Sequence, residues 1–306
     1  MLVKNFDYLA YKFELLYYID ADRKQESMNQ TKHPNSLMIK LNKHKIIRLF
    51  WWWLVIIPGV PFILTSLGLF VYAYWPRDFS SVSQFSVESN TKYITLSAHG
   101  VNDTPTSWSD ELQKIMKQAP YSQLNKINMQ NHSIDWQNYA NNVFLCSVAG
   151  KKIGNEIGKH LAKQPNLKAI HAIGHSCGAF VTFGICEGAR AINPQLIIQT
   201  TYLDPVAVYS GIFWHYGIDN FGACADFSDT YIDTRDTVPG SNQALPNSYT
   251  FDVTYKQTTK DAQYPPHAWP TRFYINAYKA KRVPLFYKAN IGKIKKFKKG
   301  ELYQFY

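Results

Sequence analysis

Hydrophobic and polar positions occur in blocks along the chain, and the longest apolar block lies near the N-terminus. From Leu49 to Trp75, 27 consecutive residues carry no charge, and aromatic residues gather at both ends of the block. About 20 apolar residues suffice for a helix to cross a bilayer, and aromatic belts are typical of its two interfaces. We therefore predict a transmembrane helix over residues 49–75; the alternative is a long buried core helix.

The charges on either side of this block predict its orientation. Four basic residues precede it, whereas a single arginine balanced by an aspartate follows it: Lys40, Lys43, Lys45 and Arg48 against Arg77 and Asp78. Basic flanks tend to stay in the cytoplasm. We therefore expect residues 1–48 to be a short cytoplasmic segment and the rest to be exported, to the periplasm or the cell exterior. A cleaved signal peptide is the competing interpretation, but the block exceeds the roughly 7–15 apolar residues of such peptides, which favours an uncleaved signal anchor.

Beyond residue 79 the pattern changes to short apolar runs that alternate with longer segments of helical character. The runs predict strands at residues 91–98, 167–173 and 196–203, and the other segments predict helices at residues 107–118, 142–164 and 177–189. Strands that alternate with helices indicate a mostly parallel sheet with helices on both faces. We expect one α/β domain over residues 79–280.

Composition and charge narrow the class of protein. The chain is 46% hydrophobic and 18% charged, which excludes a disordered protein. The net charge of +11 is concentrated at the ends, because residues 279–306 carry +8 whereas residues 79–278 carry −1. A nucleic-acid-binding domain would carry the excess on its folded surface, so nucleic acid is not an expected partner. Residues 281–306 are a basic tail, which suits either an anionic membrane surface or a solvated chain end.

The cysteines and histidines show no metal-binding pattern. The four cysteines, Cys146, Cys177, Cys186 and Cys224, have no C-x-x-C spacing, and the nine histidines have no H-E-x-x-H spacing. In an exported domain the cysteines can form one or two disulfides. Four cysteines allow three full pairings, and the sequence does not choose among them.

A G-x-S-x-G motif, Gly174-His175-Ser176-Cys177-Gly178, stands between a predicted strand and a predicted helix. At such a junction a tight turn projects the serine hydroxyl above the edge of the sheet, and the two glycines avoid Cβ clashes where the backbone crowds. The sequence therefore predicts Ser176 as a nucleophile.

A serine nucleophile needs a base, and the base needs a carboxylate to orient it. In this arrangement the chain order is serine, acid, histidine. Two histidines follow Ser176 at a distance, His215 and His267. His267 lies in a proline-rich loop before the last helical stretch, whereas His215 lies in an aromatic run typical of a packed loop. We predict His267 as the base.

The orienting acid has three candidates. Asp204 follows the predicted strand at 196–203, and a carboxylate just beyond the carboxyl end of a strand lies on the edge where such sheets carry their active sites. A simple turn residue before Pro205 is the structural alternative. Asp233 and Asp236 follow a later strand. We favour Asp204 and keep Asp236 as the alternative acid.

The reaction also needs hydrogen-bond donors for a developing oxyanion. One is the backbone N–H of Cys177, directly after the nucleophile. The second comes from the loop after an early strand, His99-Gly100-Val101-Asn102-Asp103. Because Gly100 lets the chain turn, we predict the Val101 N–H as the second donor.

These segments together resemble the α/β-hydrolase fold, and more narrowly the pancreatic-lipase-type lipases, over about residues 91–280. The resemblance is carried by His99-Gly100 after a strand, Ile134-Asp135-Trp136, the G-x-S-x-G motif, Leu203-Asp204-Pro205 and the late His267. In that family the catalytic residues are the serine of the motif, the aspartate of the L-D-P segment and the late histidine. The resemblance therefore implies Ser176, Asp204 and His267 as a catalytic triad.

We expect a membrane-anchored serine hydrolase of lipase or esterase type that cleaves carboxylic esters, with acyl lipids as the favoured substrates and no metal or organic cofactor. The expected partners are the ester substrate and the membrane, through residues 49–75 and the basic tail. The alternative is a catalytically inactive, membrane-tethered binding or scaffolding protein on the same fold. An acyltransferase that uses Cys177 is disfavoured, because Cys177 lies off the apex of the turn and has no base of its own.

Overall fold

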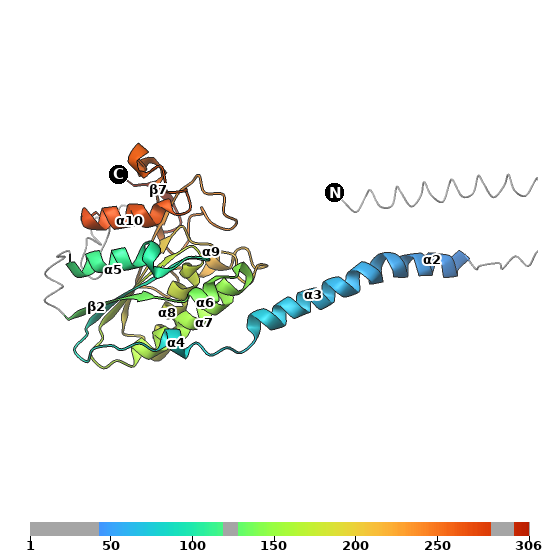
Figure 1. The fold of residues 1–306 in the computed structure, drawn as a ribbon, viewed down its shortest axis with the longest axis horizontal. Coiled ribbons are helices and arrows are strands. Elements are labelled where there is room, and N and C mark those ends of the chain that lie inside the picture. The colour runs from blue at the N-terminus through green and yellow to red at the C-terminus, as the bar shows by residue number, and fades with distance from the viewer. Residues whose placement is uncertain (1–42, 119–127, 283–296, 306) are drawn as a thin grey trace, which may run out of the picture. The chain divides into compact units, whose positions relative to one another are not determined.

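The computed structural model describes residues 43–118, 128–282 and 297–305, and Figure 1 shows the chain as a ribbon. The chain divides into two compact units, residues 1–64 and 65–306, and each is described by itself. Most of the expected cytoplasmic segment and the greater part of the expected basic tail lie outside the described residues.

An apolar helix precedes the sheet. It consists of α2 (Lys43–Trp51), a π-helical turn (Trp52–Ile56) and α3 (Ile57–Tyr74). Pro58 and Pro61 have no N–H to donate to the carbonyls four residues earlier, which accounts for an irregular turn just before them. The stretch Ile47–Tyr72 is long and apolar enough to cross a membrane, and none of its most apolar window is buried. One apolar helix near the N-terminus, as predicted, is confirmed.

Within the described residues, seven parallel strands form one sheet in the spatial order β2-β1-β3-β4-β5-β6-β7. The strands are β1 (Tyr93–Ala98), β2 (Met129–Ile134), β3 (Ala169–His175), β4 (Ile197–Leu203), β5 (Phe227–Ile232), β6 (Tyr249–Asp252) and β7 (Leu302–Gln304). The three strands predicted by residue range are β1, β3 and β4, each displaced by at most two residues at either end. All three are almost completely buried, as expected of parallel strands that are covered on both faces.

Helices cover both faces of the sheet (Figure 1). The helices α7 (Val143–Ala162) and α8 (Gly178–Ile192) share one hydrophobic core, and α5 (Ser109–Gln118) and α10 (Trp269–Lys279) share the other. Glycine lets α7 and α8 approach closely, since a Cβ on Gly154 would lie 2.1 Å from the carbonyl oxygen of Val181. The predicted parallel sheet with helices on both faces is confirmed.

Short helical segments occupy the connections. They are α4 (Ser80–Ser83), α6 (Gln137–Ala140), α9 (Tyr216–Asn220) and 3-10 turns at Pro105–Ser107, Thr254–Lys256 and Thr259–Asp261. The carboxyl ends of the parallel strands meet at one edge of the sheet, where ligands bind in open α/β sheets. The chain leaves β1, β3 and β4 there at His99, Ser176 and Asp204.

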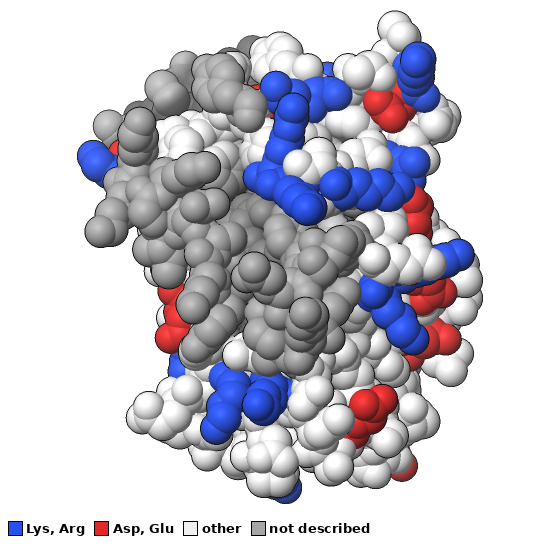
Figure 2. Space-filling view, turned by 90° about the vertical axis from the view of Figure 1, so that its left-hand side faces the viewer, with Lys and Arg blue, Asp and Glu red and all other residues white. Residues whose placement is uncertain are grey.

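The sheet extends into the segment that the sequence pattern sets apart as a basic tail. Residues Leu302–Gln304 pair with β6, and the rings of Phe297 and Phe305 pack against Phe251. Figure 2 shows one face of the molecule, on which Lys and Arg side chains gather toward the upper part with Asp and Glu beside them. Among the residues coloured by charge on that face, basic side chains are therefore interspersed with acidic ones.

Candidate active site

Ser176 lies at the apex of a sharp turn between β3 and α8. Its φ of +55° is in the left-handed region, which residues with a side chain rarely adopt. The turn is held by its neighbours, because the Ser176 N–H donates to the Leu203 carbonyl (3.1 Å) and the Val206 N–H donates to the Ser176 carbonyl (3.2 Å). The motif glycines are required by close approach, since a Cβ on Gly174 would lie 2.4 Å from the Gly178 oxygen. The motif thus forms a strained elbow, a feature that clusters at functional sites.

His267 is the histidine that the fold brings to Ser176. It lies in the loop just before α10, with Nε2 2.8 Å from Ser176 Oγ and Nδ1 2.8 Å from Asp236 Oδ2. A carboxylate only accepts, so Nδ1 carries the proton and donates to Asp236. Nε2 is then the acceptor for the Ser176 hydroxyl, which is the geometry of a general base.

Two buried carboxylates face Nδ1 of His267. Asp236, in the loop after β5, takes the hydrogen bond and is itself held by the Val238 N–H (3.1 Å) and the Ser241 hydroxyl. Asp204, at the end of β4, lies 3.7 Å from Nδ1, and neither of its carboxylate oxygens has a hydrogen-bond partner among the described residues. The sequence favours Asp204 and keeps Asp236 as the alternative. The structure brings both to His267 and gives the hydrogen bond to Asp236.

The other acid and the other histidine considered from the sequence, Asp233 and His215, are not part of this hydrogen-bond chain. Asp233 is fully buried and forms an ion pair with Arg235 at 2.5 Å, and it also accepts a hydrogen bond from the Thr254 hydroxyl. His215 is exposed at the N-terminal end of α9. Neither makes a hydrogen bond to Ser176 or His267 in the described part of the chain.

Burial and neighbouring charges shift the ionisation of the site. Burial raises the pKa of Asp204 to about 6, although the nearby His267 favours the charged form. Burial works to lower the pKa of His267, but the carboxylates of Asp204 and Asp236 outweigh it and raise that pKa above 6.5. Burial lowers the pKa of the adjacent His175 to about 3, so its imidazole is neutral, and its Nε2–H donates to the His267 carbonyl (2.8 Å). His267 is therefore the more basic of these two imidazoles, and His175 helps to hold its backbone.

The loop after β1 packs directly against the elbow. A Cβ on Gly100 would lie 2.9 Å from the Cβ of Ser176, so this position requires glycine. His99 Nδ1–H donates to the Gly100 carbonyl (3.0 Å), and Trp136 Nε1–H donates to the His99 carbonyl (3.0 Å). Burial lowers the pKa of His99 and so favours the neutral ring, whose Nε2 accepts from the Trp136 backbone N–H (3.4 Å). The His-Gly and Asp-Trp segments named in the sequence thus meet and fix the loop.

Two residues near the serine each carry a backbone N–H: Cys177 follows Ser176 directly, and Val101 follows Gly100, which packs against Ser176. Val101 and Cys177 both line the cavity above Ser176, and the N–H of each makes no hydrogen bond to a described residue. Buried amides are normally paired. Two N–H groups without a partner among the described residues are therefore candidate donors to a ligand oxygen in this cavity.

A cavity of about 700 Å³ opens above Ser176. Most of its lining is apolar, with side chains from α7, from the loop after β4 and from the loop after β5: Val143, Phe144, Val206, Val208, Trp214 and Val238. The segments around Phe144 and Gly211 touch at its mouth, since a Cβ on Gly211 would lie 2.7 Å from the Phe144 ring. The cavity can therefore hold an apolar group next to the serine.

All four cysteines form disulfides. Cys146 of α7 pairs with Cys177, and Cys186 of α8 pairs with Cys224. The first bridge lies at the site, because Cys177 follows Ser176 and both of its cysteines line the cavity. A disulfide-bonded Cys177 has no thiol to serve as a nucleophile, which argues against the acyltransferase alternative.

The ligand atoms of Asp204, Asp236 and His267 lie within 4.8 Å of one another, a spacing at which three groups can hold a metal ion. In this arrangement, however, Nδ1 donates to Asp236 and Nε2 accepts from Ser176. Both ring nitrogens are therefore in use. The cluster as it stands suits proton transfer.

The parallel sheet flanked by helices, with a serine elbow between a central strand and the following helix, defines an α/β-hydrolase fold, as the sequence predicts. No family model and no curated protein matches the chain. Among solved structures the chain is similar to a lipase-esterase related protein from Clostridium acetobutylicum, with 14% identity and a TM-score of 0.27 over 39% of this chain and 44% of that one. It is also similar to an extracellular alpha/beta-hydrolase from a Paenibacillus species, with 21% identity and a TM-score of 0.25 over 38% and 42%. The chain thus spans less than half the length of either structure.

Proposed function

We propose that the chain is a serine hydrolase that cleaves carboxylic esters through Ser176, His267 and Asp236, with Asp204 as a second carboxylate at the same histidine. The observation that carries this proposal is the unbroken hydrogen-bond chain from Ser176 Oγ through both nitrogens of His267 to Asp236, with both contacts at 2.8 Å. A nucleophile, a base and an orienting acid in this relation are recognised by geometry and role.

Acylation follows from these positions. Ser176 Oγ attacks the carbonyl carbon of the ester while its proton passes to His267 Nε2, and the C=O electron pair moves onto the oxygen. The N–H groups of Val101 and Cys177 bind this oxyanion. The electron pair then returns, the C–O bond to the alcohol breaks, and Nε2 gives its proton to the departing oxygen. Asp236 stabilises the transient imidazolium through Nδ1–H.

Deacylation repeats the sequence with water. Water gives a proton to Nε2 and attacks the acyl carbon. When the second oxyanion collapses, the acyl–Oγ bond breaks, Nε2 returns its proton to Ser176 Oγ, and the carboxylic acid is released. The carboxylates that raise the pKa of His267 make it a stronger base for both steps. The chemistry needs neither a metal nor an organic cofactor.

The cavity indicates the substrate. Its apolar walls favour an acyl group of several carbons, and we include acyl lipids in the proposed substrate class. A relationship to pancreatic-lipase-type lipases, based on the segments quoted above, is part of the same proposal.

We further propose that residues 49–75 anchor the chain in a membrane, with residues 1–48 in the cytoplasm and the domain over residues 79–280 on the exported side. The basic flank at Lys43, Lys45 and Arg48 supports the orientation. Pairing of all four cysteines supports an oxidising compartment. Contact of the basic tail with anionic lipid remains a proposal, and nucleic acid is not a proposed partner.

The deciding experiment is fluorophosphonate labelling of the purified full chain in detergent micelles, with p-nitrophenyl butyrate hydrolysis measured in parallel. Ser176→Ala is expected to abolish labelling and to lower kcat at least about 10³-fold. Ser81→Ala, at an exposed position of α4, serves as the matched control and is expected to retain both. A folded wild-type chain that neither labels nor hydrolyses the ester would favour the inactive binding protein instead.

A further inference from the structure

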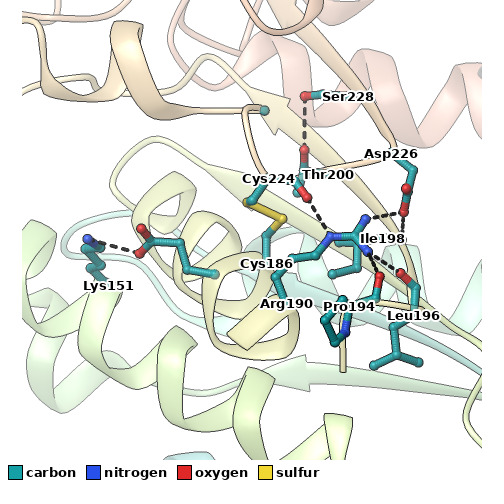
Figure 3. Close-up of a disulfide and its surroundings, with 12 residues drawn as sticks. Lys151, Cys186, Arg190, Pro194, Leu196, Ile198, Thr200, Cys224, Asp226 and Ser228 are labelled. Carbon is teal, nitrogen blue, oxygen red and sulfur yellow. Dashed lines mark hydrogen bonds and ion pairs between the residues drawn. A yellow bond between two sulfur atoms is a disulfide. The ribbon is translucent and has the colours of Figure 1, made fainter. Parts of the chain in front are cut away.

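Two disulfides in different surroundings hold α8, one through Cys186 within the helix and one through Cys177, the residue just before it. Cys186–Cys224 lies near the amino ends of β4 and β5, where the Arg190 guanidinium donates to the Cys224 carbonyl (3.0 Å) and pairs with Asp226, as Figure 3 shows. Arg190 also reaches the carbonyls of Pro194 and Leu196. None of these residues lines the cavity. The region around Cys186–Cys224 is thus stabilised by several hydrogen bonds and an ion pair in addition to its disulfide.

Cys146–Cys177 lies at the opposite edge, beside the nucleophile. The Ser176–Cys177 peptide is held on its carbonyl side, where Ser176 O accepts from the N–H groups of Val206 and Ala179 at 3.2 Å each. On its amide side the Cys177 N–H has no partner among the described residues. The Cys177 carbonyl accepts from the Phe180 N–H in the first turn of α8 (3.1 Å), and the Cys177 side chain, bonded to Cys146, joins this residue to α7.

The same bridge reaches the wall of the cavity. The first turn of α7 is capped by Asn142, whose side chain accepts from the Phe144 and Leu145 N–H groups, and Phe144 lines the cavity. One residue beyond Cys146, the Ser147 hydroxyl accepts from the Ser210 N–H (2.8 Å) in the loop after β4. Cys146 is therefore set in a segment that is anchored on both sides and forms part of the apolar lining.

We propose that the Cys146–Cys177 disulfide is a positioning element of the oxyanion site, which holds the Cys177 N–H in line with the Val101 N–H and ties it to the apolar wall of the cavity. The inference rests on the proposed function. Because the bridge acts on a group that binds the oxyanion rather than the neutral ester, its loss weakens transition-state binding more than substrate binding. The signature is therefore a lower kcat with little change in KM.

The second disulfide supplies a matched control. The two bridges join cysteines 31 and 38 residues apart, so chain entropy predicts similar losses of stability when either is removed. The experiment compares Cys146→Ala/Cys177→Ala with Cys186→Ala/Cys224→Ala, each as the full chain in detergent micelles and below its melting midpoint. With p-nitrophenyl butyrate, we expect kcat to fall about 10- to 100-fold in the first pair, part of the 10²–10³-fold effect of a complete oxyanion donor. The KM of Cys146→Ala/Cys177→Ala should stay within about 3-fold of the wild-type value. The kcat of Cys186→Ala/Cys224→Ala should also stay within about 3-fold of the wild-type value.

Two further measurements separate alignment from folding. The inhibition constant of an alkyl boronic acid, which forms a tetrahedral adduct on the serine, should rise in the first pair in proportion to the loss of kcat. In the Cys186→Ala/Cys224→Ala variant, excess dithiothreitol reduces the one remaining bridge to two thiols and is itself oxidised to its cyclic disulfide. That treatment should lower kcat by the same factor and be reversed by reoxidation, whereas Cys146→Ala/Cys177→Ala should not respond.

Equal losses of kcat in the two pairs, no loss in either pair, or a loss confined to KM would each overturn the inference while leaving the serine hydrolase intact. The reduction experiment decides the matter if the first pair does not fold, because it starts from folded protein. A wild-type chain that shows neither labelling nor hydrolysis removes the proposed function and this inference together.

Discussion

The carboxylate of Asp204 lies 3.7 Å from Nδ1 of His267, fully buried and without a hydrogen-bond partner among the described residues. Burial of a carboxylate is costly, and burial accordingly raises the pKa of Asp204 to about 6 although His267 favours the charged form. Asp236 holds the hydrogen bond at the same nitrogen. Two carboxylates thus lie within 4 Å of the same imidazole nitrogen, one hydrogen-bonded to it and the other not.

This arrangement predicts that either carboxylate can partly replace the other in orienting His267. Asp236→Asn should lower kcat/KM about 10- to 100-fold, well short of the roughly 10⁴-fold loss seen when a triad has a single carboxylate. Asp204→Asn alone should cost less than about 10-fold, and the double variant should approach the full loss. The measurement is kcat/KM for p-nitrophenyl butyrate, with Asp219→Asn on exposed α9 as the control. A full loss in Asp236→Asn alone would show that Asp204 cannot substitute.

The raised pKa of Asp204 also predicts that the stability of the protein depends on pH. Its pKa is about 6 in the native state and about 3.8 when unfolded, so the native state binds more protons between these values. Stability contributed by this group therefore falls as pH rises from about 4 to 6 and then levels off. The free energy of unfolding of Asp204→Asn, measured relative to that of wild type, should therefore increase by up to about 3 kcal/mol as the pH rises from 4 to 7. Thermal melts of both proteins across this range test it, and a difference that does not vary with pH would contradict it.

The central strands and the elbow could be predicted because their signals are local. The strands β1, β3 and β4 are short apolar runs buried on both faces, and the G-x-S-x-G motif is contiguous in sequence. The strand β2 has the polar sequence MQNHSI and lies at the edge of the sheet, half-buried along most of its length, so it has no such run. The strand β7 has three residues and stands in a basic context, and only its pairing with β6 identifies it.

The details of the site depend on distances that sequence patterns do not contain. Asp204 and Asp236 both follow strands and both precede His267 in the chain, so chain order cannot distinguish them. Their separation from Nδ1 differs by less than 1 Å, 2.8 Å against 3.7 Å. The pairing of Cys146 with Cys177 likewise follows from the close packing of α7 on α8, which brings two distant segments together.

We expect the apolar cavity to favour longer acyl chains, and we expect Trp214 to contribute to this preference. Trp214 lines the cavity and is 53% exposed, so an acyl chain can cover it. Trp214→Ala should raise KM for p-nitrophenyl decanoate about 10-fold, the effect of losing roughly 1.4 kcal/mol of apolar contact, and leave p-nitrophenyl acetate unchanged. Tyr255→Ala is the matched control, because Tyr255 is 76% exposed but does not line the cavity. Equal effects on the two esters would place the acyl chain elsewhere.

The proposed orientation in the membrane can be tested through the disulfides themselves. If the catalytic domain is exported, its four cysteines are oxidised in the cell and react with a maleimide only after reduction. Replacing Lys40, Lys43, Lys45 and Arg48 with alanine removes the basic flank that favours a cytoplasmic N-terminus. We expect this variant to accumulate a fraction with free thiols, in which the domain has stayed on the cytoplasmic side, and the same fraction to resist protease added from the exported side. Lys279→Ala/Lys281→Ala, which removes basic residues distant in sequence from the helix, should behave as wild type. Free thiols in the wild-type chain would instead place the domain in the cytoplasm and refute the proposed orientation.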